Sequence, residues 1–145
     1  MVKPDWDATR NELIDTYKTL NFRVRGRTED ELTAEHGGTS IREEIAAMRE
    51  HEMIFAKALT NALLGDTSGQ VDEDETVSLT GDESTNVLIS QFGNARATTL
   101  NTIASLDDEM WDRPFVGNKK VLDLVNELAA NDRAHLEKIT RMLGA

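Results

Sequence analysis

The stretch that decides the fold is VLDLVNELAANDRAHLEKITRM, residues 121–142. Its apolar residues recur every three or four positions, which is the spacing of one buried face of an α-helix. They are Val121, Val125, Leu128, Ile139 and Met142. The stripe is interrupted once, because Asp132 and His135 stand where apolar side chains are expected. This pattern predicts a long amphipathic helix whose buried face carries polar residues at its middle.

A second amphipathic pattern lies upstream, in residues 41–64, and it has a similar interruption. Glu52 takes a core position half-way along a ladder whose other members are apolar: Ile41, Ile45, Met48, Phe55, Leu59 and Ala62. Ser40 and Glu43 form a predicted capping box, in which the hydroxyl and the carboxylate satisfy free amides at the helix start. Gly65 supplies a C-terminal stop. The sequence therefore predicts a helix that places Glu52 in the core.

Two further long helices and one short helical turn follow from spacing and caps. Residues 6–24 and 88–106 repeat apolar side chains at helical intervals, and TEDE (residues 28–31) has the capping-box pattern of a short turn. Residues 109–117 then form a connection to Asn118, the expected N-cap of a last helix that begins near position 119. No strand-like alternation of any length competes. We therefore predict an all-α fold, a four-helix bundle.

Residues 65–84 form the one long connection, which is acidic and contains no basic residue. Neighbouring antiparallel helices in bundles are usually joined by about 2–8 residues. The greater length of this connection favours a crossover between two parallel helices. The acidic run itself is interpreted as a solvated loop.

The amino-acid composition excludes several classes of function. The 145 residues, a single domain spanning 1–145, include 27 acidic and 16 basic residues, and the formal net charge is −11. Binding to nucleic acid depends on basic groups that displace counterions, so no nucleic-acid partner is expected. The absence of cysteine excludes disulfides and a cysteine nucleophile from this chain. The first residues contain no apolar run, so neither a signal peptide nor a membrane span is expected, and the predicted location is cytoplasmic.

The two interrupted helices place three polar side chains in the predicted core: Glu52, Asp132 and His135. His51 and Asn131 flank the same helix faces, and these five residues form the candidate pocket. Buried carboxylates must be paired, hydrated or bound to a ligand. Two interpretations stay open. The residues form either a closed structural network or a small pocket between helices that binds a small molecule.

No catalytic residue is assigned. The segment HEMIF (residues 51–55) begins like a zinc-protease helix, but a phenylalanine stands where the second histidine is required. Trp111 and Phe115, in the last connection, could anchor a partner protein, although we favour their packing onto the end of the bundle. His36 lies in a glycine-rich loop and is expected to be a solvated surface residue.

Two stretches resemble one protein family. SIREEIAAMREHE (residues 40–52), preceded by Gly37-Gly38, resembles the second helix of the DinB-like four-helix-bundle superfamily, and VLDLVNELAANDRAHLEKI (residues 121–139) resembles its fourth. This superfamily includes the mycothiol-dependent maleylpyruvate isomerase bundle and bacillithiol-transferase-like proteins. The resemblance covers essentially the whole chain. It implies an up-down-down-up bundle with the long crossover between the second and third helices.

The resemblance also implies where a metal would bind. Members typically hold one divalent metal with three histidines, and these positions fall on Ala47, Asn131 and His135. Only His135 keeps an imidazole, so the usual site for a metal such as zinc or nickel is expected to be lost. The alternative is a carboxylate-rich replacement site for a divalent metal, built from Glu52, Asp132 and His135.

These observations lead to two functional expectations. The first is a metal-free DinB-like module that binds a small molecule or forms a homodimer, as the family commonly does through helix faces. The second is an enzyme, a thiol-dependent transferase or isomerase with a divalent metal at a rearranged site and a low-molecular-weight thiol as cosubstrate. The enzyme predicts an accessible His135 hydrogen-bonded to Glu52 or Asp132. A structural module predicts that these groups form a closed network.

Overall fold

The computed structural model describes residues 4–71 and 83–144. They form six helices: α1 (Asp7–Val24), α2 (Glu29–Thr33), α3 (Ile41–Leu63), α4 (Thr85–Ala104), α5 (Asp108–Asp112) and α6 (Val121–Met142). In this part of the chain there is no strand, only two isolated bridges. The predicted all-α class is therefore confirmed. The expected solvated loop lies largely in residues 72–82, outside the described residues.

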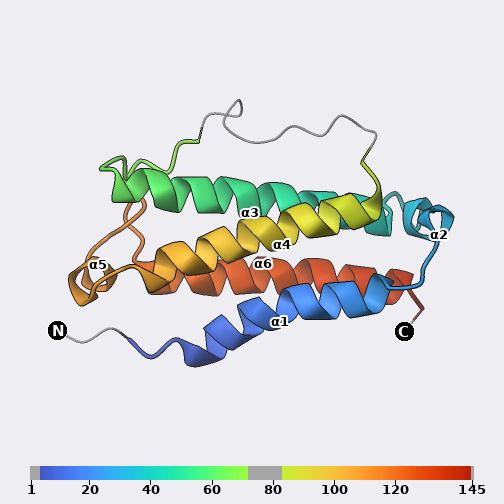
Figure 1. Cartoon of the computed structure of the whole chain (residues 1–145), viewed down its shortest axis with the longest axis horizontal. Coiled ribbons are helices and arrows are strands. Elements are labelled where there is room, and N and C mark those ends of the chain that lie inside the picture. Colours follow the sequence, from blue (N-terminus) through green and yellow to red (C-terminus); the bar gives the residue numbers. More distant parts are fainter. Residues whose placement is uncertain (1–3, 72–82, 145) are drawn as a thin grey trace.

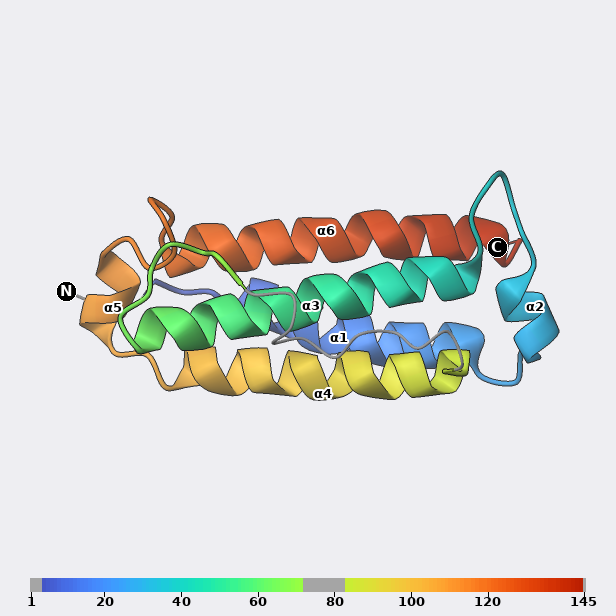
Figure 2. The same ribbon diagram turned by 90° about the horizontal axis from the view of Figure 1, so that it is seen from above.

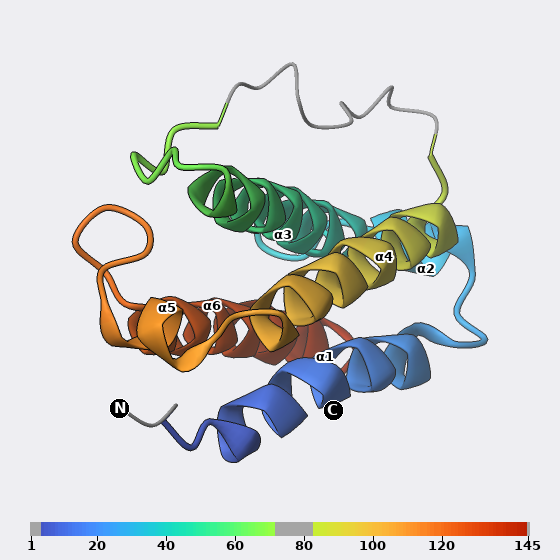
Figure 3. The same ribbon diagram turned by 60° about the vertical axis from the view of Figure 1, so that its left-hand side comes forward.

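The four long helices lie side by side along the long axis of the molecule (Figure 1). α1 and α6 run in one direction and α3 and α4 in the other, as the colours show in Figures 1 and 2. α3 packs on α4 and on α6, and α1 packs on α6 and on α4. The short helices lie at opposite ends, α2 near the start of α3 and α5 near the start of α6 (Figures 2 and 3).

Local caps explain where most of the helices begin. Thr28 accepts a hydrogen bond from the Glu31 amide, and Glu31 accepts one in return, so the predicted capping box of α2 is confirmed. Ser40 accepts from the Glu43 amide at the start of α3, so the hydroxyl half of the predicted capping box is confirmed. Gly65, just beyond the end of α3, has a φ of 102°, a left-handed conformation that favours glycine.

The beginning of the last helix differs from the prediction. Asn118 is not its N-cap. It lies in a tight turn in which Val116 and Lys119 form an isolated bridge. The N-cap is Lys120, two residues later than predicted, and the helix begins at Val121. The predicted connection before it contains α5, capped by Asp107, whose side chain accepts from the Met110 amide. A five-residue helix is too short for its apolar period to be visible in sequence.

The apolar core is divided into two clusters. One lies at the α5 end and includes Trp6, Leu59, Trp111 and Val125, and the other lies towards α2 and includes Leu20, Met48, Phe92 and Ile139. Each of the four long helices contributes to both clusters. The buried residues between the two clusters are therefore at mid-helix, and they include the charged residues Arg49, Glu52, Arg96 and Asp132.

The aromatic residues of the last connection are part of the core. Trp111 and Phe115 are both 2% exposed, and the Trp111 ring lies 5.4 Å from that of Trp6. The interpretation that they pack onto the end of the helices is confirmed. None of the described helices combines the length and the hydropathy needed to cross a membrane.

Candidate functional site

A buried arginine joins the two mid-helix carboxylates. Arg96 of α4 donates from Nε and Nη2 to the two carboxylate oxygens of Glu52 on α3, at 2.9 and 2.7 Å. Its Nη2 also donates to Oδ2 of Asp132 on α6, at 2.6 Å. The three residues are 2%, 0% and 2% exposed, respectively. The two carboxylates therefore converge on one cation, a point that the sequence had left open.

The remaining helix supplies a backbone partner to the same guanidinium. Arg96 Nη1 donates to the main-chain carbonyl of Leu13 in α1, at 2.6 Å. The guanidinium carbon also lies 5.0 Å from the centre of the Phe92 ring, within the range of a cation–π contact. All four long helices therefore meet at Arg96. We refer to Glu52, Arg96 and Asp132 as the buried triad.

Burial changes the acidity of the triad. Burial, reinforced by the negative charge of Glu52, raises the pKa of Asp132 from 3.8 to about 6, although Arg96 opposes the change. Burial alone would lower the pKa of Arg96. The hydrogen bond and charge of Glu52, together with those of Asp132, outweigh it and raise that pKa above its usual value. The triad thus holds one permanent cation and one carboxylate that titrates near neutrality.

Arg96 was not among the predicted core residues, although its helical spacing indicates a core position. The predicted apolar ladder of the third long helix passes through Ala95, which is half-buried, whereas the adjacent Arg96 is buried. A ladder through Phe92, Arg96 and Thr99 has the same helical steps of four and three. The buried face of a helix is recognised from its apolar residues, so an arginine on that face is overlooked. It could have been inferred only from the need of the buried carboxylates for a cationic partner.

His135 does not belong to the triad, and the prediction that it would complete a network with Glu52 and Asp132 is wrong. Its Nδ1 lies 3.0 Å from Oε1 of Glu44, a residue that is 8% exposed. Glu44 also accepts a hydrogen bond from the Thr39 hydroxyl at 3.2 Å, and Lys138 lies 3.8 Å from it. Towards an ionised carboxylate, Nδ1 of an imidazole is the donor.

The Glu44–His135 contact should be visible in stability. His135→Ala should lower the free energy of unfolding by about 1–3 kcal/mol, because a largely buried carboxylate loses a donor. Chemical denaturation of wild type, His135→Ala, Glu44→Gln and the double variant measures the coupling directly. The double variant should lose less than the sum of the two single variants. Additive losses would show that the two side chains do not interact.

The other two candidate residues lie beside this pair. His51 is exposed on α3, and its pKa is lowered by partial burial, an effect that Glu52 opposes and that the charges of His135 and Arg96 reinforce. Asn131 is half-buried on α6, and its Nδ2 is buried without a hydrogen-bond partner in the part of the chain that is described. The five candidates therefore divide into a buried pair, Glu52 and Asp132, and three residues outside the triad.

The residues at the positions where the resemblance implies a metal do not fit one. Ala47 has no ligand atom, Asn131 offers only an amide, and His135 alone keeps an imidazole. The replacement site also fails, because the oxygens of Glu52 and Asp132 are bound by Arg96 and His135 is turned to Glu44. Within residues 4–71 and 83–144, no group of three or more potential ligands is arranged to hold a metal ion.

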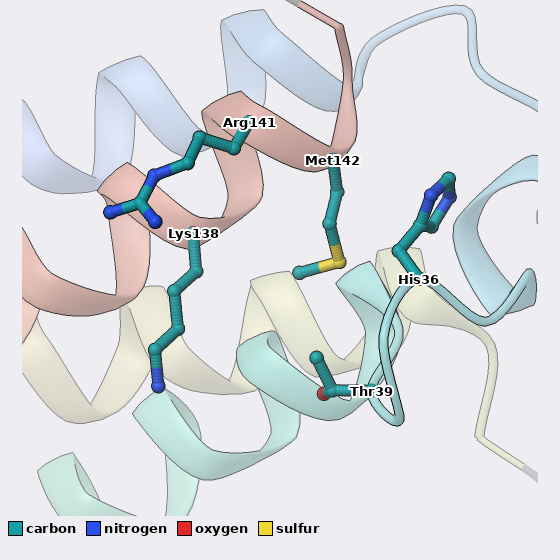
Figure 4. Close-up of a pocket in the computed structure, with 5 residues that line it drawn as sticks. All are labelled: His36, Thr39, Lys138, Arg141 and Met142. Atoms are coloured by element: carbon teal, nitrogen blue, oxygen red, sulfur yellow. The ribbon is translucent and has the colours of Figure 1, made fainter.

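A hollow opens next to the Glu44–His135 pair, between the turn that precedes α3 and the end of α6. Its volume is about 290 Å³, and five residues line it: His36, Thr39, Lys138, Arg141 and Met142. Figure 4 shows the Met142 side chain between the basic side chains on one side and the turn on the other. Gly37 and Gly38, both with positive φ, form the turn and bring His36 and Thr39 into a bridge. As expected, His36 is exposed, but it also contributes to this hollow.

The sequence was also compared with known proteins. No protein-family model matches it, and no curated protein matches it significantly.

Proposed function

We propose that this chain is a metal-free, DinB-like four-helix bundle, up-down-down-up with a long crossover, that binds a small molecule in the hollow between residues 36–39 and the end of α6. The observation that carries the proposal is the position of the hollow. It opens beside the half-buried Glu44–His135 pair, whereas the mid-helix carboxylates are already paired by Arg96.

The helix directions support the bundle topology. α3 and α4 run parallel (Figure 1), and residues 64–84 separate the end of α3 from the start of α4, a length that suits a crossover connection. His135 gives independent support for the DinB-like assignment. A metal-binding histidine usually donates its second ring N–H to a carboxylate, and Nδ1 of His135 lies 3.0 Å from the Glu44 carboxylate.

The enzymatic alternative has less support. A thiol-dependent transferase or isomerase would need its metal at the positions of Ala47, Asn131 and His135, or at the triad. The first set retains one ligand, and the second is occupied by a guanidinium. A role in binding a small molecule requires neither of these metal sites.

Restoring the missing ligands tests the DinB-like assignment. The double variant Ala47→His/Asn131→His should gain one tightly bound Zn²⁺ or Ni²⁺ per chain, because three converging imidazoles form a metal site. Nδ2 of Asn131 has no hydrogen-bond partner within the described residues, so replacing Asn131 breaks no hydrogen bond of that atom. Metal content and isothermal titration measure the result, and the same variant with His135→Gln is the control. If the double variant binds no more metal than the control, positions 47, 131 and 135 do not converge and the assignment fails.

Methionine-methyl spectra test the binding role. Met142 is the one methionine that lines the hollow, and its signal can be assigned with Met142→Leu. The protein, ¹³C-labelled at its methionine methyl groups, would be titrated with benzoate, benzyl alcohol and benzylamine. At least one of these fragments should shift the Met142 signal in a saturable manner. If none does, the hollow is not a binding site for small organic molecules and this proposal is overturned.

A further inference from the structure

The geometry points to an organic anion as the ligand of this hollow: we propose that Arg141 and Lys138 bind a carboxylate or phosphate head group, while the apolar part of the molecule packs on Met142. This inference rests on the proposed binding function and specifies the class of ligand. The first argument for it is the charge of the lining. Two of the five lining residues, Lys138 and Arg141, are cationic, and no acidic residue lines the hollow, although the whole chain has a net charge of −11.

The basic side chains come from two distant parts of the chain. His36 lies in the turn before α3, whereas Lys138 and Arg141 lie in the last turns of α6, and all three line one hollow (Figure 4). The positions of Lys138 and Arg141 are three apart, so they share one face of the helix. A guanidinium presents several donors in a fixed geometry that matches a carboxylate or phosphate, and an ammonium adds a compact charge.

Neither α6 cation is held strongly by the protein itself. Arg141 pairs with Glu137 at 2.7 Å, but both side chains are 68% exposed, and such surface pairs contribute little to stability. Lys138 lies 3.8 Å from Glu44, and that carboxylate is already bound by His135 and Thr39. An incoming anion can therefore compete for both cations without leaving a buried charge unpaired.

The floor of the hollow suits an apolar group. The Met142 side chain is flexible and polarizable, so it adapts to aromatic or aliphatic surfaces. A volume of about 290 Å³ is at the lower end of the range for ligand sites. The site therefore fits a small organic acid or phosphate ester, with one anionic head and a short apolar tail.

The experiment extends the methionine-methyl titration. Benzoate, phenyl phosphate, benzyl alcohol and benzylamine share an aromatic ring and differ in head-group charge. In Tris buffer, one or both anions should bind about tenfold more tightly than the alcohol and the amine, because only the anions form charge-assisted hydrogen bonds with Arg141 and Lys138. The tighter of the two anions identifies the preferred head group.

Two double variants that each remove two positive charges test whether the anion binds at the hollow. Lys138→Gln/Arg141→Gln should weaken anion binding by about tenfold. The control Arg113→Gln/Lys119→Gln removes the same charge from exposed positions near α5, and should leave the affinity within about twofold. Benzyl alcohol binding as tightly as the anions, or equal losses in the two double variants, would overturn the anion proposal but not the binding function. If no fragment shifts Met142, the binding function itself fails.

Discussion

Replacing Arg96 with methionine should lower the free energy of unfolding by about 3–5 kcal/mol. Methionine fills a similar volume but removes the only cation bound to Glu52 and Asp132 in the described structure. Two carboxylates would then remain in the core without a partner, and the Leu13 carbonyl would lose a donor. Urea denaturation at pH 7 measures the loss. It should be accompanied by a large fall in Tm.

Two further variants make this result specific. Arg133→Met removes an arginine one residue from Asp132 that pairs with Glu12 at the surface, and it should cost less than about 1 kcal/mol. Replacing the whole triad, as Glu52→Leu/Arg96→Met/Asp132→Leu, should recover most of the stability, because a fully apolar layer leaves no charge unpaired. If Arg96→Met were as stable as Arg133→Met, the carboxylates would not depend on Arg96.

Asp132 should give the protein an unusual pH dependence. Its pKa is raised from 3.8 to about 6 in the folded state, so the native protein binds this proton more tightly than the unfolded chain. The resulting stabilisation is fully present below pH 3.8 and is lost as the pH rises through about 6. A shift of this size corresponds to about 3 kcal/mol.

The difference between wild type and Asp132→Asn isolates this effect from the other carboxylates. The free energy of unfolding, measured by urea denaturation from pH 4 to pH 8, should fall in wild type relative to Asp132→Asn by about 3 kcal/mol. Most of the change should occur between pH 4 and about 7. Asp15→Asn, at an exposed position on α1, is the matched control. A constant difference across this range would show that Asp132 does not titrate as inferred.

The triad also explains why the helices pair in one register. Shifting α4 by one turn, about 5.4 Å, would place Phe92 or Leu100 opposite Glu52 in place of Arg96. Both carboxylates would then lose their cation, whereas the two apolar clusters would tolerate many alternative contacts. A buried polar layer of this kind contributes less to net stability than to the choice of one arrangement.

Local signals in the sequence predicted much of the fold. The apolar period of residues 121–142 and 41–64 identified two long helices, because one buried face requires this spacing whatever it packs against. The caps at Thr28 and Ser40 were equally predictable, since a helix start needs acceptors within a few residues. α5 was missed because five residues do not establish a period.

The sequence by itself determined that Glu52 and Asp132 enter the core, because their positions on the apolar stripes depend only on residues in the same helix. Only the tertiary structure decided what they bind. Their partner Arg96 comes from a third helix, and His135 contacts Glu44, which lies 91 residues away in the chain. The hollow likewise joins a turn at residue 36 to a helix end at residue 141. Periodicity specifies which face of a helix is buried, whereas pairing between charged groups depends on which helices become neighbours and in what register.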